Sequence, residues 1–133
     1  MKRNKPMYGI VQGLVLVLTF LLASTMLNSE YLFQWADQNR LFYLALCVVP
    51  LVLLLLNKNL MSAFITMGIV AGIFIGNYLG GWINTYNESK ITAIMSAEEV
   101  ARLRHHPGFE IWMGVILTSA VIGMIAQRFY AKE

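Results

Sequence analysis

Four long stretches of the chain carry almost no charge, and they restrict the fold more than any other feature. They cover about residues 8–27, 41–56, 60–84 and 108–127. About 20 apolar helical residues cross the ~30 Å hydrocarbon core of a bilayer, so each stretch predicts a membrane-spanning helix. A soluble domain would mix apolar and charged residues more evenly than a 133-residue chain that is 58% hydrophobic and 13% charged. We therefore expect one all-α membrane domain over residues 1–133, a polytopic four-transmembrane-helix bundle.

The second stretch is the shortest, because 16 residues reach only ~24 Å in a helix. We expect its outer end to extend into the preceding polar loop, residues 28–40. Tyr31, Phe33 and Trp35 in that loop are typical of interfacial anchors or of a short surface helix. The next connection, residues 57–59, is so short that it predicts a tight antiparallel hairpin.

Glycine recurs every fourth residue along the third stretch, at Gly68, Gly72, Gly76 and Gly80. Such a row predicts a glycine zipper, a groove in which another helix backbone comes very close. Three kinds of partner fit the groove: another span of this chain, a second copy, or a different subunit. Within the chain, the small residues that fit are in span four, with Gly114 and Gly123, and in span one, with Gly9 and Gly13.

The longest connection predicts a helix of its own. Ser96 and Glu99 have the spacing of a capping box, which starts a helix over about residues 96–105. We expect this amphipathic, extracytoplasmic helix to lie along the membrane surface or to cover the mouth of the bundle.

The charges predict the orientation. Basic residues dominate at the two termini and in the 57–59 connection, with Lys2, Arg3, Lys5, Lys58, Arg128 and Lys132 against Glu133. The other side mixes Arg40, Lys90, Arg102 and Arg104 with Glu30, Asp37, Glu88, Glu98 and Glu99. Because Lys and Arg are enriched on the cytoplasmic side, both termini are predicted to be cytoplasmic. Trp35, Trp82 and Trp112 would then lie toward the outer interface.

Residues that could carry chemistry are few. Glu110 lies in the first turn of span four beside His105 and His106, and it favours either a headgroup-level carboxylate or the mouth of a cation or proton pathway. One histidine, Glu110 and Glu98 or Glu99 would be needed for a metal site, but no metal-binding motif supports one. Asn77 favours an interhelical hydrogen bond, or a polar pathway with Tyr78 and Asn84.

The segment from residue 72 to 123 shows one family resemblance. Its parts G-I-F-I-G-N-Y-L-G-G-W and P-G-F-E-I-W-M-G-V are similar to the small subunit I of bacterial ATP synthases, in which a glycine-rich span precedes a proline- and phenylalanine-containing entry into the next. The chain departs from that pattern at Gly80, where the family usually carries an acidic residue, and in the inserted helix of residues 96–106. The resemblance therefore assigns no family.

These observations favour a small accessory or regulatory subunit that packs, through the glycine row of its third span, on a larger complex in the bacterial inner or plasma membrane. The alternative is a homo-oligomeric channel or transporter for an ion, a neutral solute or a lipid-like solute. No enzyme is predicted, because no nucleophile lies beside a base and no carboxylate pair lies at depth. No cofactor, metal or nucleic acid is expected, and the partners are the lipid bilayer and another membrane subunit or a second copy.

Overall fold

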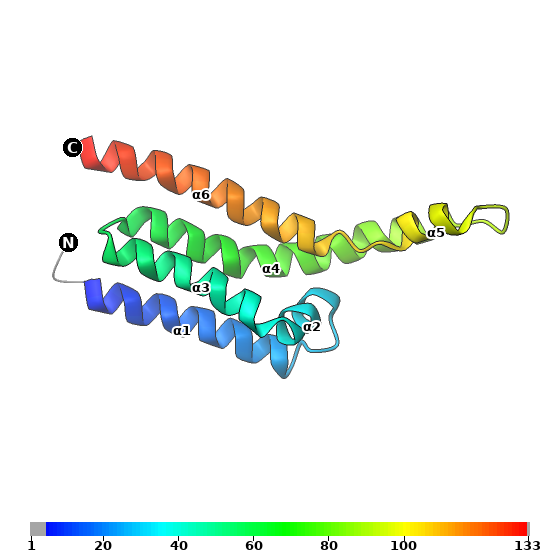
Figure 1. The fold of residues 1–133 in the computed structure, drawn as a ribbon, viewed down its shortest axis with the longest axis horizontal. Helices are drawn as coiled ribbons and strands as arrows, with labels where there is room; N and C mark the ends of the chain where they lie inside the picture. Colours follow the sequence, from blue (N-terminus) through cyan, green and yellow to red (C-terminus); the bar gives the residue numbers. More distant parts are fainter. Residues whose placement is uncertain (1–4, 133) are drawn as a thin grey trace.

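The computed structural model is all-helical over the residues it describes, 5–132. Lys2, Arg3 and Glu133, which enter the orientation argument, lie outside these residues. The helices follow the chain as α1 (Lys5–Ser24), α2 (Tyr31–Gln38), α3 (Arg40–Leu55), α4 (Asn59–Glu88), α5 (Ala97–Arg104) and α6 (Gly108–Lys132). Figure 1 shows α1, α3, α4 and α6 side by side, with both chain ends and the α3–α4 turn at one end of the molecule.

Three helices are long and apolar enough to cross a membrane: Pro6–Ser24 of α1, Asn59–Glu88 of α4 and Gly108–Tyr130 of α6. A fourth span results if α2 and α3 count as one broken span, since they are bent by 89° at their junction. The prediction that the second span extends into the preceding loop therefore holds only if this bent pair forms one span. The loop aromatics form the separate helix α2, which turns across the end of the bundle because Leu32, Phe33 and Ala36 are buried.

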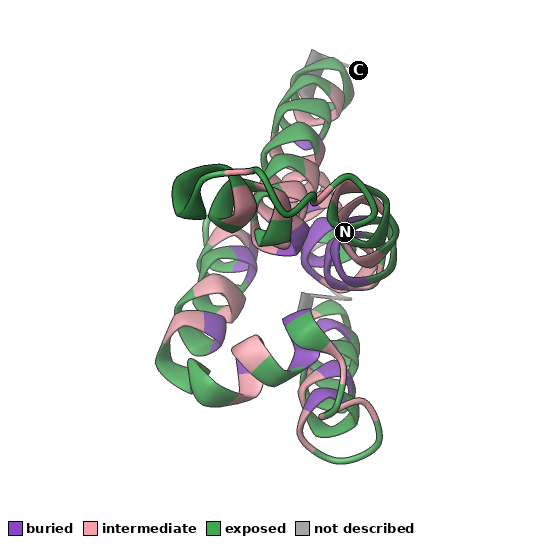
Figure 2. Cartoon of the chain, turned by 90° about the vertical axis from the view of Figure 1, so that its right-hand side faces the viewer, coloured by how far each residue is buried: buried purple, intermediate pink, exposed green. Residues whose placement is uncertain are grey.

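Helix α4 organises the fold, since it contacts every other helix. Its buried residues recur along the faces turned toward its neighbours, from Ser62 to Gly80. In the end-on view of Figure 2, buried residues face the centre of the helix group, whereas the outward faces of α1, α3 and α6 are exposed. These exposed faces carry large apolar side chains, among them Leu18, Leu44 and Leu117, where a soluble bundle would carry polar ones. Such faces fit helices that contact lipid.

The glycine row of α4 packs against α6. A Cβ added at Gly72 would lie 2.9 Å from the Trp112 ring and 3.2 Å from Val115. One added at Gly76 would lie 2.5 Å from the backbone oxygen of Gly108. At Gly68 the obstacle is Ser119, at 2.7 Å, and at Gly80 it is Gly108, at 2.8 Å. The partner of the groove is thus span four of the same chain.

The other small residues named from the sequence behave differently. Gly123 of α6 packs on α4, where an added Cβ would lie 2.9 Å from Phe64. A Cβ at Gly114 or Gly13 would meet nothing within 4 Å, and one at Gly9 would meet only Leu54, at 3.9 Å. Gly114 therefore takes no part in the packing of α6 on α4, because it lies on the exposed face of α6.

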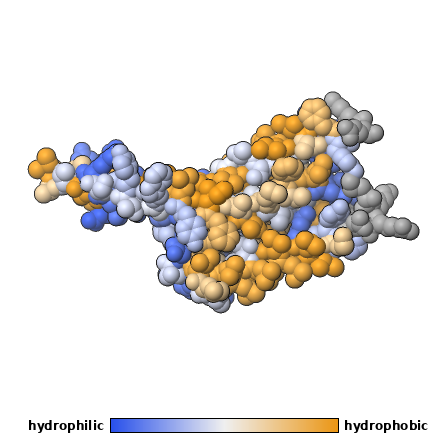
Figure 3. Space-filling view, turned by 180° about the vertical axis from the view of Figure 1, so that it is seen from behind, coloured by the Kyte–Doolittle hydropathy of each residue, from blue (hydrophilic) through white to orange (hydrophobic). Residues whose placement is uncertain are grey.

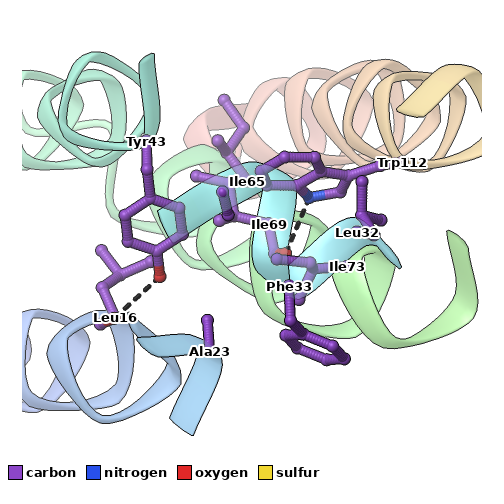
Figure 4. Packing of buried hydrophobic residues seen from close by; sticks show 10 residues of the cluster. Leu16, Ala23, Leu32, Phe33, Tyr43, Ile65, Ile69, Ile73 and Trp112 are labelled. Carbon is purple, nitrogen blue, oxygen red and sulfur yellow. Dashed lines mark hydrogen bonds between the residues drawn. The ribbon is translucent and has the colours of Figure 1, made fainter. Parts of the chain in front are cut away.

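An aromatic cluster fills the centre of the bundle near α2. Trp112 is fully buried, and its indole N–H donates to the backbone oxygen of Ile69 at 3.0 Å, as Figure 4 shows. The Trp35 and Phe42 rings meet Trp112 edge-on, with centroids 6.3 Å away in each case. Trp112 is thus buried among the helices, whereas Trp82 is 73% exposed. That all three tryptophans lie toward the outer interface stays a prediction.

The α3–α4 hairpin is as tight as its length predicts. Asn57 adopts φ 63°, and the Lys58 N–H donates to the Leu53 carbonyl at 2.8 Å while the Asn57 N–H donates to that of Leu54 at 3.0 Å. These two bonds form a Schellman motif, which ends a helix by satisfying its last carbonyls. The turn therefore fixes the backbone of Lys58.

Helix α5 begins at the predicted capping box. The Ser96 hydroxyl accepts from the Glu99 N–H at 3.2 Å, and the Glu99 carboxylate accepts from the Ser96 N–H at 3.3 Å. Helix α5 contacts α4 alone, whereas α2 crosses the end of the bundle that α5 was expected to cover. The end of α4, the following loop and α5 (residues 82–104, here called the outer arm) project beyond the other helices (Figure 1).

Replacing Gly76 by Ala tests the close approach of α4 and α6. The added methyl group would meet the Gly108 backbone, so α6 must move away from α4. We expect a loss of about 1–3 kcal/mol of unfolding free energy, as for other overpacked sites. The measurement is reversible unfolding by sodium dodecyl sulfate in mixed micelles. Gly114→Ala is the matched control and should keep or slightly raise stability; equal losses in both variants would contradict the assignment.

Candidate functional site

The His105–Glu110 segment lies where α2, α4 and α6 meet. Two glycines make room for the His106 ring: a Cβ at Gly80 or at Gly108 would lie 2.8 Å from it. The Gly108 N–H donates to Nδ1 of His106 at 3.0 Å, and the ring stacks on Tyr31 with centroids 4.0 Å apart. His106 thus connects the start of α6 with α2 and α4.

His105 and Glu110 pair with each other. Nε2 of His105 lies 2.8 Å from a Glu110 carboxylate oxygen, and both side chains are more than half exposed. An exposed pair of this kind adds little stability. Glu110 therefore lies at the surface, where its carboxylate pairs with His105; a role at the mouth of a pathway stays a prediction.

Burial lowers the pKa of His106, and the nearby His105 charge lowers it further, while Glu110 acts in the opposite direction. The stacked Tyr31 ring and the Gly108 N–H face the same imidazole. A proton on Nδ1 would remove the acceptor that Gly108 uses, so the neutral ring is the form that fits the junction. The bond from Gly108 to His106 therefore forms when the imidazole is neutral and is lost when Nδ1 binds a proton.

Asn77 is 3% exposed and has partners at both ends of its amide. Its oxygen accepts from the Leu32 N–H at 2.9 Å, and its nitrogen donates to the Glu30 carboxylate at 3.2 Å. Since Leu32 lies in the first turn of α2, Asn77 caps that helix from a neighbouring one. Tyr78 is exposed and Asn84 donates to the Arg104 carbonyl at 2.9 Å, so the three residues do not line one pathway.

A second polar cluster lies deep between α1, α3 and α4. The Gln12 side-chain oxygen lies 2.8 Å from the Ser62 hydroxyl and 3.0 Å from that of Thr66. The Ser62 hydroxyl also lies 2.6 Å from the Pro50 carbonyl. Tyr43 adds a nearby tie, donating to the Leu16 carbonyl at 2.7 Å. These groups satisfy one another, which is what apolar surroundings demand of buried polar atoms.

Over residues 5–132, no cluster of three His, Cys, Asp or Glu residues could hold a metal ion. Glu98 binds Arg102 at 3.0 Å and Glu99 belongs to the capping box, so neither joins His105 and Glu110. No charged side chain is buried in the same part of the chain. What the described residues do offer is packing surfaces and grooves.

An apolar groove runs between α1 and α3, with a volume of about 550 Å³. Gly13, Leu16 and Phe20 line it from α1, and Tyr43 and Cys47 from α3. Arg40 lies at one end, with its guanidinium carbon 5.7 Å above the Phe20 ring and a bond of 3.1 Å to Asp37. In the sequence, Gly13 is the residue that points to this groove, although its pattern predicts helix packing there.

The outer arm exposes large apolar side chains where no other helix covers them. Ile94 is 95% exposed at the arm's end, and Trp82 and Tyr86 are exposed along it. In Figure 3 the arm carries apolar patches among hydrophilic residues, in contrast to the nearly continuous apolar surface of the bundle. The lone Ile94 within the polar connection was the sequence signal for this feature.

Acidification tests the state of His106. Because its folded pKa is lowered, the unfolded chain binds the proton first, and stability falls as the pH drops below about 6.5 toward the folded value. We expect faster amide hydrogen exchange in α2 and the first turn of α6 at pH 5.5 than at pH 7.5, after correction for intrinsic exchange. His106→Gln should remove this pH dependence. An identical response in both proteins would show that another group titrates.

Comparison with known proteins adds no relative. No protein-family model, curated protein or solved structure matches the chain. The resemblance of residues 72–123 to subunit I of bacterial ATP synthases is therefore not supported by a match to a family model.

Proposed function

We propose that the protein is a non-catalytic accessory or regulatory subunit that docks on a larger membrane protein through its outer arm. In this proposal the chain crosses a bacterial inner or plasma membrane four times, with α2 and α3 as one broken span and both termini cytoplasmic. Support for this orientation comes from the basic Lys58 and Arg128 at the end of the molecule that also holds both termini (Figure 1).

The outer arm is the observation that carries the proposal. Helix α4 has 30 residues and is ~45 Å long, well beyond the ~30 Å hydrocarbon core. Its last turns therefore leave the membrane and carry α5 with them. An isoleucine that lies beyond the lipid is exposed to water, and covering it with another apolar surface lowers the free energy. The exposed side chains that would pack against an apolar surface on the outer side of a partner are Ile94, Trp82 and Tyr86.

The glycine row no longer serves as the docking surface. Because α6 occupies the groove, Gly72→Leu or Gly76→Leu could not act on association alone. The same variants would instead disturb the fold. The docking surface in this proposal is therefore the projecting end of α4, and not the glycine row in its middle.

A photo-crosslinking residue at position 94 tests the docking proposal in the protein's own membrane. We expect one defined adduct with a foreign subunit, and a loss of that subunit from native complexes of Ile94→Asp. Burial of an isoleucine contributes about 1.5–3 kcal/mol, so the affinity should fall about tenfold or more.

Leu117 provides the control for this experiment, because it is an exposed apolar residue of α6 within a predicted span. A crosslinker there should give lipid adducts rather than the same subunit, and Leu117→Ser should retain the complex. Adducts at position 94 that contain only lipid, or only a second copy of the chain, would refute the accessory function.

The second candidate function is a homo-oligomeric transporter of a lipid-like solute, and the groove between α1 and α3 favours it. Gly13→Leu would fill this groove without a backbone clash, since an added Cβ there meets nothing within 4 Å. If the protein transports, liposomes that contain it alone should show saturable lipid flux that Gly13→Leu abolishes. Gly114→Leu is the matched control on α6 and should keep the flux. Absence of flux in the unaltered protein would exclude this function.

A further inference from the structure

A second cavity lies at the opposite end of the molecule from the outer arm. It has a volume of about 530 Å³ and is enclosed by the α3–α4 turn, the start of α4 and the last turns of α6. Its polar lining includes Lys58, Gln127 and Arg128, and its apolar lining Leu56, Met61 and Met124. None of the lining residues within the described part of the chain is acidic.

The two cations come from helices far apart in sequence, and their backbones are fixed. The Schellman turn holds Lys58 through the bond from its N–H to Leu53. On the other side, the Gln127 side-chain oxygen accepts from the N–H groups of Leu60 at 2.9 Å and Met61 at 3.4 Å. Gln127 therefore binds the end of α6 to the start of α4 and places the adjacent Arg128 at the cavity. Because Gln127 already satisfies these donors of α4, the anion-binding character of the site comes from the two side-chain charges.

The chemistry of this lining selects one class of ligand. Two cations without a carboxylate favour an anion, and arginine and lysine are the usual partners of phosphate oxygens. The apolar lining comes from the end of α3, the start of α4 and α6. In the four-span arrangement proposed above, this end of the molecule would lie between headgroups and acyl chains. A zwitterionic headgroup would bring its own cation toward Lys58 and Arg128, whereas an anionic headgroup would not.

We propose that the cavity formed by Lys58, Gln127 and Arg128 binds the phosphodiester of an anionic phospholipid, with its acyl chains along Met61 and Met124. Basic pockets between transmembrane helices on the cytoplasmic side are suited to anionic headgroups. The preference of Lys and Arg for the cytoplasmic side explains why basic residues gather at this end. It does not require that two of them share one cavity with apolar walls. The proposal is independent of docking by the outer arm, which lies at the other end of the chain.

The test is native mass spectrometry of the full-length protein released from detergent, with equal amounts of phosphatidylglycerol and phosphatidylcholine that carry the same acyl chains. We expect preferential binding of phosphatidylglycerol. Each surface cation contributes about 1 kcal/mol toward an anionic lipid, so Lys58→Gln and Arg128→Gln should each weaken its binding roughly fivefold. Arg102→Gln, which removes an arginine paired with Glu98 on the outer arm, is the matched control and should bind as the unaltered protein does.

Gln127→Ala separates a built site from diffuse attraction, because it keeps both charges and removes the side chain that lines the cavity and accepts from the N–H groups of Leu60 and Met61. We expect weaker binding of phosphatidylglycerol in this variant at an unchanged helix content, measured by circular dichroism. Equal binding of the two lipids by the unaltered protein, or unchanged binding in the Lys58→Gln/Arg128→Gln double variant, would overturn the proposal. Displacement of the lipid by millimolar inorganic phosphate would overturn the assignment to a phospholipid and identify a site for free phosphate.

Discussion

The close approach of α4 and α6 is the interaction on which the rest of the structure depends. Gly76 and Gly108 bring the two backbones together, and Trp112 fills the space beside them with its N–H bonded to Ile69. In lipid, helices gain nothing from hiding apolar surface, so association relies on such packing and on hydrogen bonds between helices. Helix α2 crosses the end of the bundle against this pair and against α1 and α3.

Polar side chains in this protein connect helices rather than line a path. Asn77 holds the start of α2, Gln12 joins α1 to α4, and Gln127 joins α6 to α4. Each uses an amide oxygen to accept hydrogen bonds from groups that would otherwise be unsatisfied in a medium without water.

Both proposals locate function at the ends of the molecule, where the chain leaves the hydrocarbon. At the outer end the excess length of α4 carries apolar side chains into water, and at the inner end two cations meet above an apolar wall. A subunit held by a partner on one side and by anionic lipid on the other would be fixed in depth and rotation. His106 adds a group near the outer end whose protonation opposes the packing of α2 and α6.

Local sequence determined the helices, the hairpin at residues 57–59 and the capping box of α5, because hydrophobic length, loop length and capping depend on neighbours along the chain. It also identified the glycine row. Only the tertiary structure decided that α6 occupies that row, that α2 turns by 89° away from α3, and that Trp112 is buried. A glycine face or a tryptophan has the same sequence pattern whether lipid, another subunit or the same chain covers it. The choice depends on which helices can approach one another, and that is a property of the whole chain.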